Sequence, residues 1–383
     1  MAHRDKPMKA ATRQASSASL IVRVEGKQSP NRQGLDALTL QEVMQKYRVP
    51  GVSIAVVKDF SIDWAKGFGT ADVETALPVD AHTLFQAASI SKPVTAMAVL
   101  KAVQDGRMSL DADINTLLKS WKLRQGEFAN TPVTPRALLS HTSGAGNGFG
   151  FPGYHPSQSQ PTLVQILEGQ KPSNVGPVFF ERPTFSAFKY SGGGTILMQL
   201  AMTDTLGKPF PEIMREYVLD PLGMANSTFE QPLSPAADTG AARGHGWDGK
   251  AMDTKWHVYP EQAAAGLWTT PTDLAQFIIE IQQAVRGPTG RVLAQEMARE
   301  MVTPVGVGPF AVGFGVKQRG EGWYFGHDGS NFGFQCRLWA HVRKGYGVVI
   351  MTNGDYGAPV IEEIESRVAS AYHWDSLDKP LPR

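Results

Sequence analysis

Residues 85–104 read FQAASISKPVTAMAVLKAVQ and carry a clear helix signal. Pro93 falls in the first turn, and Val94, Met97, Ala98 and Val103 follow at helical spacing. Asp105-Gly106 closes the pattern. We therefore expect a helix over Ser91–Gln104, directly preceded by the sequence Ser89-Ile90-Ser91-Lys92.

Strand signals lie on both sides of this helix, toward the two ends of the chain. Before it, the β-branched run Gly51–Val57 and the stretch Ser61–Phe68, separated by a turn at Lys58-Asp59, predict an antiparallel hairpin. After it, strands are predicted over Trp323–His327, Phe334–Val342 and Tyr346–Met351. Further helices are expected over Leu38–Tyr47, from a capping box at Thr270–Asp273, and over Val360–Tyr372.

This order of elements predicts an α+β fold of the α/β sandwich type. One antiparallel sheet is built from both termini and flanked by helices, with an inserted all-helical domain. We expect a disordered lead-in over residues 1–36, an α/β domain over 37–110 plus 250–383, and the all-helical domain over 111–249. The active site is expected in the cleft between the two domains.

Composition and charge describe an ordinary globular protein. Hydrophobic residues make up 42% of the chain, and the formal net charge is +1, so attraction to nucleic acid is not indicated. A lone cysteine, Cys336, excludes an intramolecular disulfide. No run approaches the roughly 18 to 20 apolar residues of a membrane span. With no signal peptide visible, we expect a cytoplasmic protein, or a periplasmic one if an export signal had been removed. The oligomeric state is left open.

The pair Ser89 and Lys92 is the first candidate for chemistry. Residues three apart at a helix start lie on one face, so the lysine can approach the serine hydroxyl. A serine becomes an effective nucleophile when an adjacent base takes its proton, and lysine can be that base when burial depresses its pKa. Ser-x-x-Lys also occurs at Ser186 with Lys189 and at Ser376 with Lys379, but only Ser89 precedes a strong apolar helix.

Two glycine-rich motifs follow further along the chain. Tyr190-Ser191-Gly192-Gly193-Gly194 can present a tyrosine hydroxyl to a substrate, and a neighbouring cation would lower the pKa of that hydroxyl. His327-Asp328-Gly329-Ser330 ends a predicted strand, where Gly329 allows close approach of the backbone and His327 can hydrogen-bond to substrate or tyrosine. Taken alone, Tyr190 can also be a core tyrosine beside a turn, and His327 can be a histidine that only shapes a turn.

The chain lacks the sequence motifs that mark several other classes of hydrolase. There is no Gly-x-Ser-x-Gly elbow and no P-loop, and no histidine forms the spacing of a zinc peptidase. Ser140-His141-Thr142-Ser143-Gly144 resembles a triad in composition, but residues so close in sequence more often shape a loop.

The three motifs in this order, about 100 and then 137 residues apart, resemble the class C β-lactamase-like serine hydrolase family. That family includes class C β-lactamases, D-Ala-D-Ala carboxypeptidases and the family VIII-type esterases. The resemblance extends over roughly Leu38–Tyr372 and includes landmarks at Leu138–Gly144, Pro221–Met224 and Ala265–Pro271. It implies the serine β-lactamase and penicillin-binding-protein fold, and no metal or organic cofactor.

The resemblance also implies roles for individual residues. Ser89 would be acylated, Lys92 and Tyr190 would share the general-base work, and the backbone N–H groups of Ser89 and Ser330 would form the oxyanion hole. Two positions depart from the β-lactamases: Gly192 replaces an asparagine that binds the substrate amide, and His327 replaces a lysine that holds the substrate carboxylate. A neutral imidazole is a poorer anchor for a carboxylate than an ammonium group.

These departures favour a small-molecule ester as the substrate. We therefore expect a carboxylesterase with an acyl-enzyme intermediate. The alternatives are a β-lactamase or D-amino-acid carboxypeptidase or amidase, a penicillin-binding sensor that is acylated without turnover, and an inactive module that kept the fold. We expect the pocket to be lined by parts of Gly146–Tyr154 and Trp247–Tyr259, whose aromatic content indicates an apolar acyl group.

Overall fold

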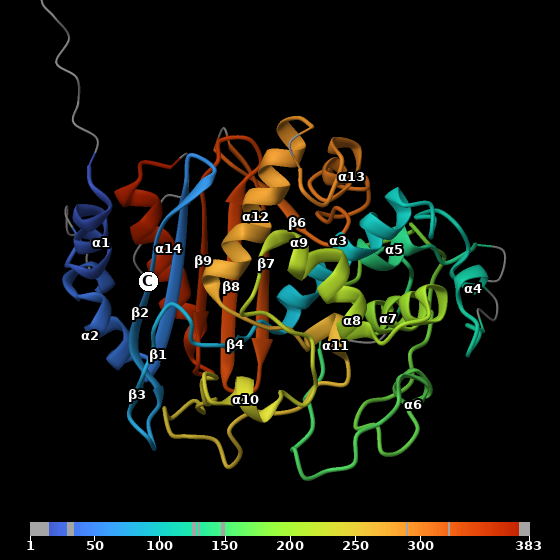
Figure 1. Cartoon of the computed structure of the whole chain (residues 1–383), viewed down its shortest axis with the longest axis horizontal. Coiled ribbons are helices and arrows are strands. Elements are labelled where there is room, and N and C mark those ends of the chain that lie inside the picture. Colours follow the sequence, from blue (N-terminus) through green and yellow to red (C-terminus); the bar gives the residue numbers. More distant parts are fainter. Residues whose placement is uncertain are drawn as a thin grey trace, which may run out of the picture.

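Strand β1 (Gly51–Lys58) joins the two ends of the chain, because it pairs antiparallel with β2 (Ser61–Asp72) on one side and with β9 (Gly347–Thr352) on the other. The computed structural model describes residues 15–28, 34–124, 128, 131–146, 150–288, 290–320 and 322–374. Its main sheet has seven strands in the order β3-β2-β1-β9-β8-β7-β6, and all neighbours are antiparallel (Figure 1). The predicted sheet built from both termini is confirmed.

The other strands are short or belong to the C-terminal hundred residues. They are β3 (Leu77–Pro78), β6 (Gly315–Arg319), β7 (Gly322–Asn331) and β8 (Phe334–His341). A separate two-stranded sheet pairs β4 (Phe85–Gln86) with β5 (Trp268–Thr269). This small sheet brings the segment before Ser89 beside residues that follow it by some 180 positions in the chain.

Both faces of the main sheet are covered by helices. On one face, α1 (Ser17–Glu25), α2 (Leu40–Lys46) and α14 (Gly357–Ala371) pack over Val52, Ile54 and Val56 of β1. On the other, α12 (Pro271–Arg286) packs on Ala55 and Val57, with α3 (Ser91–Gln104) in the same core. Because both faces are buried, β1 is apolar at almost every position instead of alternating.

The predicted lead-in requires a correction where the structure describes it. Ser17–Glu25 form a helix whose Leu20 and Val24 are buried against the α14 side of the sheet. The fully buried guanidinium of Arg367 donates hydrogen bonds to backbone carbonyls on both sides of residues 29–33. This tertiary anchoring orders a segment that looks featureless in isolation. Residues 1–14 and 29–33 lie outside the described residues.

Helices dominate the middle of the chain. The named elements between α3 and α11 are α4 (Ile114–Leu117), α5 (Pro135–Leu139), α6 (Leu163–Glu168), α7 (Gly192–Leu206), α8 (Phe210–Met214), the π-helical turn η4 (Arg215–Leu219), α9 (Asp220–Leu222) and α10 (Pro235–Asp238). Elsewhere lie η1 (Gly34–Ala37), η2 (Ala88–Ile90), α11 (Gln262–Ala265) and α13 (Gln295–Glu300). The domain boundaries stay a prediction.

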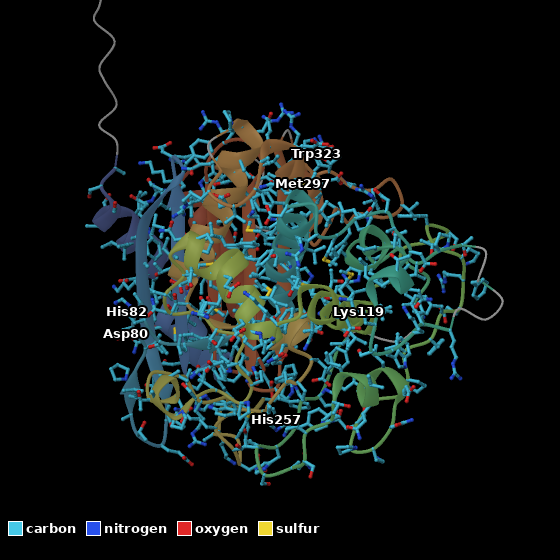
Figure 2. The ribbon with its side chains drawn as sticks, turned by 45° about the vertical axis from the view of Figure 1, so that its right-hand side comes forward. Asp80, His82, Lys119, His257, Met297 and Trp323 are labelled. Carbon is cyan, nitrogen blue, oxygen red and sulfur yellow. The ribbon has the colours of Figure 1, made fainter. Side chains whose placement is uncertain are left out.

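Figure 2 shows the side chains on this framework, with Lys119 beside the helical region and Asp80 and His82 on the side of β1 and β2. In the part of the chain that the structure describes, no helix is both long enough and apolar enough to cross a membrane.

Candidate active site

Ser89 lies in a strained turn at the start of α3. The turn η2 places Ala88 at a φ of 48°, a left-handed conformation that costs a non-glycine residue roughly 1 kcal/mol or more. Its neighbour Ala87 donates its N–H to Leu267 (2.9 Å) and accepts the thiol proton of Cys336 (3.0 Å). These contacts from two distant segments hold the turn, so Ser89 is presented at a fixed point of the cavity wall.

Gly329 permits the close approach of β7 to this turn. A Cβ at position 329 would lie 2.3 Å from the carbonyl oxygen of Ala87 and 2.4 Å from the sulfur of Cys336. We expected this glycine to allow close approach of the backbone to a ligand, and in the structure it allows β7 to approach the turn that holds Ser89.

Lys92 is buried behind Ser89. Its Nζ lies 2.9 Å from Ser89 Oγ and donates to the carbonyl oxygen of Ala264 at 2.8 Å. Burial lowers the pKa of Lys92 to about 7, because desolvation disfavours the charged ammonium. A substantial fraction of Lys92 is therefore neutral near pH 7, and a neutral amine at this distance can accept the hydroxyl proton of Ser89.

Tyr190 is brought to the same place by the loop before α7. Its ring lies 5.2 Å from Lys92 Nζ, and it makes a hydrogen-bond interaction with Ser89. The sequence-based expectation of a lowered pKa is wrong here: burial raises the pKa of Tyr190, and the interaction with Ser89 only partly offsets that effect. Tyr190 therefore keeps its proton at neutral pH.

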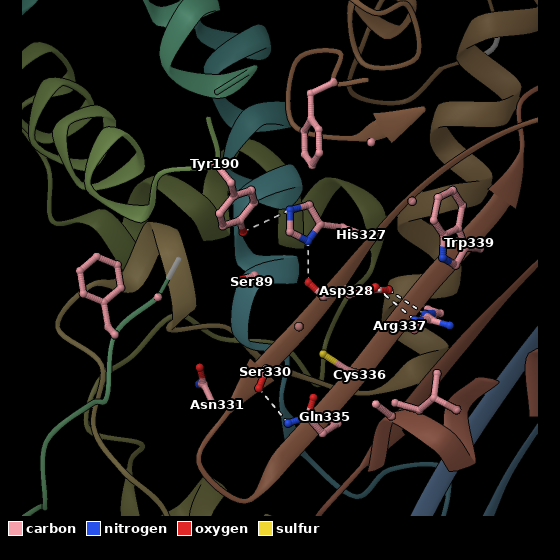
Figure 3. Close-up of a pocket in the computed structure, with 18 of the residues that line it drawn as sticks. Ser89, Tyr190, His327, Asp328, Ser330, Asn331, Gln335, Cys336, Arg337 and Trp339 are labelled. Carbon is pink, nitrogen blue, oxygen red and sulfur yellow. Dashed lines mark hydrogen bonds and ion pairs between the residues drawn. The ribbon is translucent and has the colours of Figure 1, made fainter. Parts of the chain in front are cut away.

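His327, on β7, completes the cluster 137 residues further along (Figure 3). Its Nδ1 lies 2.6 Å from the carbonyl oxygen of Asp328, which can only accept, so Nδ1 carries the proton. Burial lowers the pKa of His327 to about 4, which leaves Nε2 unprotonated at neutral pH. The hydroxyl of Tyr190, 3.5 Å away, is therefore the donor to Nε2 in a long hydrogen bond.

His141 was not predicted as a site residue, yet it lies directly behind Tyr190. The two ring centroids are 4.2 Å apart, and Nδ1 of His141 accepts the backbone N–H of Ser191 at 3.2 Å. Burial holds its pKa well below the ordinary value. His141 is thus a neutral packing partner that fixes the ring of Tyr190. The neighbouring Ser140 and Thr142 hydroxyls bond to each other, which agrees with a loop rather than a relay.

Beyond Gly326, strand β7 has an edge that β6 does not cover. The β6–β7 ladder ends with Gly315 opposite Gly326, and η2 packs against β7 where that ladder ends. Ser330 lies on this stretch, with its hydroxyl accepting a hydrogen bond from Gln335 at 2.8 Å. Ser330 is the β-ladder partner of Gln335, so this hydrogen bond joins two residues paired across β7 and β8.

A cavity of about 1130 Å³ is lined by Ser89, Tyr190, His327 and Ser330. Figure 3 shows Ser89, Tyr190 and His327 along it on one side of β7, with Arg337 and Trp339 further along β8. The predicted loops contribute Gly150, Phe151, Pro152 and Trp247, while residues 147–149 lie outside the described residues. Phe188 and Phe310 also line the cavity, which was not predicted, and their rings stack with centroids 5.4 Å apart.

The remaining Ser-x-x-Lys matches are not assembled into a site in the described residues. Ser186 donates its hydroxyl to the carbonyl of Pro183, and Lys189 pairs with Glu181 at 2.8 Å, both on the exposed surface. Ser376 and Lys379 lie outside the described residues.

The sequence was compared with a protein-family model and with curated proteins. The family model described as Beta-lactamase matches residues 37–372. Among curated proteins, Protein flp of Staphylococcus aureus strain MW2 is 23% identical over 91% of this chain and 68% of its own length. Esterase EstB of Burkholderia gladioli is 24% identical over 76% of this chain and 78% of its own.

Solved structures share the fold. The D-amino acid amidase from Ochrobactrum anthropi SV3, in its complex with L-phenylalanine, superposes with a TM-score of 0.72 at 22% identity, covering 93% of this chain and 98% of that one. The β-lactamase/D-alanine carboxypeptidase from Pseudomonas syringae gives 0.71 at 20% identity, over 92% and 99%.

Proposed function

The chain belongs to the beta-lactamase family of serine hydrolases, and from that premise we propose that it is a carboxylesterase in which Ser89 is the nucleophile. The observation that carries the ester assignment is the buried, neutral imidazole of His327 beside Tyr190. At the position where the β-lactamases place a lysine, this chain offers a carboxylate-bearing substrate no positive charge. A neutral ester needs none.

The proposed acylation begins with Lys92. Its neutral amine accepts the proton of Ser89, 2.9 Å away, as Oγ attacks the ester carbonyl. The carbonyl π electrons move onto oxygen, where the backbone N–H groups of Ser89 and Ser330 receive the negative charge. When the tetrahedral intermediate collapses, the C–O bond to the alcohol breaks, and the alkoxide takes a proton before it leaves.

We assign that proton to Tyr190. Because burial raises the pKa of its hydroxyl, Tyr190 is an acid rather than a base at the start of the reaction. Lys92, protonated in the first step, then returns a proton to Tyr190, which restores both groups. Water then attacks the acyl-enzyme carbonyl while Lys92 takes its proton. When this second intermediate collapses, the bond from the acyl carbon to Ser89 Oγ breaks, Lys92 gives the proton to Oγ, and the carboxylic acid is released. In this scheme Lys92 and Tyr190 have separate tasks, whereas the family resemblance alone implied a shared one.

The comparisons support this proposal without choosing a substrate. One curated relative carries the name of an esterase, and solved structures of the same fold are a D-amino acid amidase and a D-alanine carboxypeptidase. The substrate is a small molecule in every reading. Ester, D-amino-acid amide and β-lactam cleavage all pass through an acylated serine, so they are separated by what anchors the substrate rather than by the nucleophile.

Turnover of three substrates by one preparation tests the proposal. p-Nitrophenyl butyrate, a D-amino-acid p-nitroanilide and a chromogenic cephalosporin are assayed with wild type, Ser89→Ala and the control Ser186→Ala. We expect ester turnover in wild type and in the control, its loss in Ser89→Ala, and at least about tenfold lower kcat/KM for the charged cephalosporin. Sustained cephalosporin hydrolysis exceeding ester hydrolysis would assign a β-lactamase. A stoichiometric burst with no turnover would indicate an acylated sensor.

A further inference from the structure

Gly192 is the first residue of α7, and the ring of Phe151 lies directly against it. A Cβ placed at position 192 would be 2.7 Å from Cε2, 3.2 Å from Cζ and 3.6 Å from Cδ2 of that ring. Gly192 has ordinary helical backbone and does not need glycine for its conformation. The absence of a side chain at position 192 therefore leaves room for the ring of Phe151, and any larger residue would displace that ring.

Hydrogen bonds to the residues that follow Phe151 hold its loop in place. The carbonyl of Pro152 accepts hydrogen bonds from Nδ1 of His257 (3.0 Å) and from the hydroxyl of Tyr259 (3.5 Å). Tyr154 pairs with Val258 through two backbone hydrogen bonds of 2.8 Å. The ring is thus held between this anchored loop and the N-terminus of α7, two residues from Tyr190.

The same ring faces the cavity that contains Ser89. Phe151 is half-buried and lines the cavity together with Phe188 and Phe310. The ring of Phe310 contacts Tyr190 and His327, and Phe188 stacks on Phe310. An acyl group bonded to Ser89 on this side meets aromatic faces and edges. Offset or edge-on aromatic contacts stabilise a bound ring beyond the burial of its area.

We propose that Phe151 is the residue that selects the acyl group, that Gly192 seats its ring, and that the preferred acyl group is aromatic. This inference rests on the proposed esterase function and names its substrate class as uncharged esters of arylalkanoic acids. It assigns the pair a shared role, so the effects of changing the two residues are coupled rather than independent.

Two esters with one leaving group measure the preference, p-nitrophenyl phenylacetate and p-nitrophenyl acetate. The readout is the ratio of their kcat/KM values, which cancels general damage to the catalytic residues. We expect Phe151→Ala to lower this ratio by about tenfold, in keeping with the loss of one aromatic contact. Gly192→Ala should lower it similarly by displacing the ring. The double variant should be no worse than Phe151→Ala alone.

Two controls fit the geometry. Gly176→Ala adds a methyl group at a glycine with nothing within 4 Å and should leave the ratio unchanged. Trp247 lines the cavity but packs on Tyr356, so its change to alanine should combine independently with Gly192→Ala. Independent, additive effects of Phe151→Ala and Gly192→Ala would overturn the inference, as would an unchanged ratio in either single variant.

A second measurement separates this inference from the esterase proposal. Boronic acids add reversibly to a nucleophilic serine without any turnover, so benzylboronic acid and methylboronic acid report acyl-side selectivity whatever the enzyme hydrolyses. We expect the aromatic compound to bind at least about tenfold more tightly in wild type, and the advantage to shrink in both variants. Equal affinities would overturn the inference even where esters are hydrolysed. An aromatic preference without ester turnover would overturn only the esterase assignment.

Discussion

Lys92 Nζ donates a hydrogen bond of 2.8 Å to the carbonyl oxygen of Ala264, a residue 172 positions later in the chain. The carbonyl belongs to the short helix α11, which packs against α3 and α7. The same amine lies 2.9 Å from Ser89 Oγ, and burial lowers its pKa to about 7, so that it can act as a base near neutral pH.

The first prediction concerns the pH dependence of activity. Lys92 acts as a base only when deprotonated, and its pKa is about 7, so kcat/KM for a neutral ester should rise through pH 7 and level off above it. Lys92→Ala should lower kcat/KM by about 10²-fold or more and abolish this inflection. A wild-type profile that is flat between pH 6 and 8 would contradict the assignment of Lys92 as the base.

Lys92 should also lower the free energy of unfolding near pH 7. Its pKa is about 7 in the folded protein, against an ordinary value of about 10.4, so between these values the unfolded chain binds more protons and the free energy of unfolding rises with pH. Lys92→Met should therefore be inactive yet more stable than wild type at pH 7, by about 1 to 3 kcal/mol after loss of the hydrogen bonds. Denaturant titrations at pH 7 and 10 check this, and the difference should shrink at pH 10.

Tyr190→Phe tests the separate role of the tyrosine hydroxyl. The change removes the proposed proton donor, and we expect kcat to fall by about 10²-fold. The ring remains packed on His141, at 4.2 Å between centroids, so the melting temperature should change little. An ester with a good leaving group, such as a p-nitrophenyl ester, should suffer less than an ethyl ester, because p-nitrophenolate needs no proton to depart. Equal losses for both esters would argue against Tyr190 as the acid.

His327→Lys tests whether charge at this position sets the substrate class. An ammonium group beside Tyr190 would attract a carboxylate, so kcat/KM for a chromogenic cephalosporin should rise relative to a neutral ester, by about tenfold. His327→Gln is the matched control, since it is neutral like the native imidazole and should leave the relative preference unchanged. The ratio of the two kcat/KM values decides the outcome.

Glu261 provides a prediction away from the reacting atoms. Both of its carboxyl oxygens are buried with no hydrogen-bond partner among the described residues, and burial raises its pKa to about 7. Between the ordinary glutamate pKa of about 4.3 and 7 the folded chain binds more protons than the unfolded one, so this residue lowers the stability as pH rises. Glu261→Gln should be more stable than wild type at pH 8, and the two should converge near pH 4. Parallel stability curves would show that folding does not raise the pKa of Glu261.

Local patterns in the sequence were sufficient for much of the framework. The helix Ser91–Gln104 and the first hairpin strand were predicted to within one residue, because helical spacing and β-branched runs act over a few neighbours. The second strand was predicted to end at Phe68 but continues to Asp72. The three motifs were recognised in the same way. Helix α1 was missed because its order depends on Arg367, more than 300 residues away.

The chemistry of the candidate site was decided by the tertiary structure. The sequence by itself determined that Ser89 and Lys92 share one helix start, and that Tyr190 and His327 stand beside glycines. It did not determine that burial would neutralise His327, raise the pKa of Tyr190 and lower that of Lys92. A pKa depends on how much water the whole fold removes from a group, and that desolvation is created by segments such as β7, α11 and the loop of Phe151 that meet only when the chain has folded.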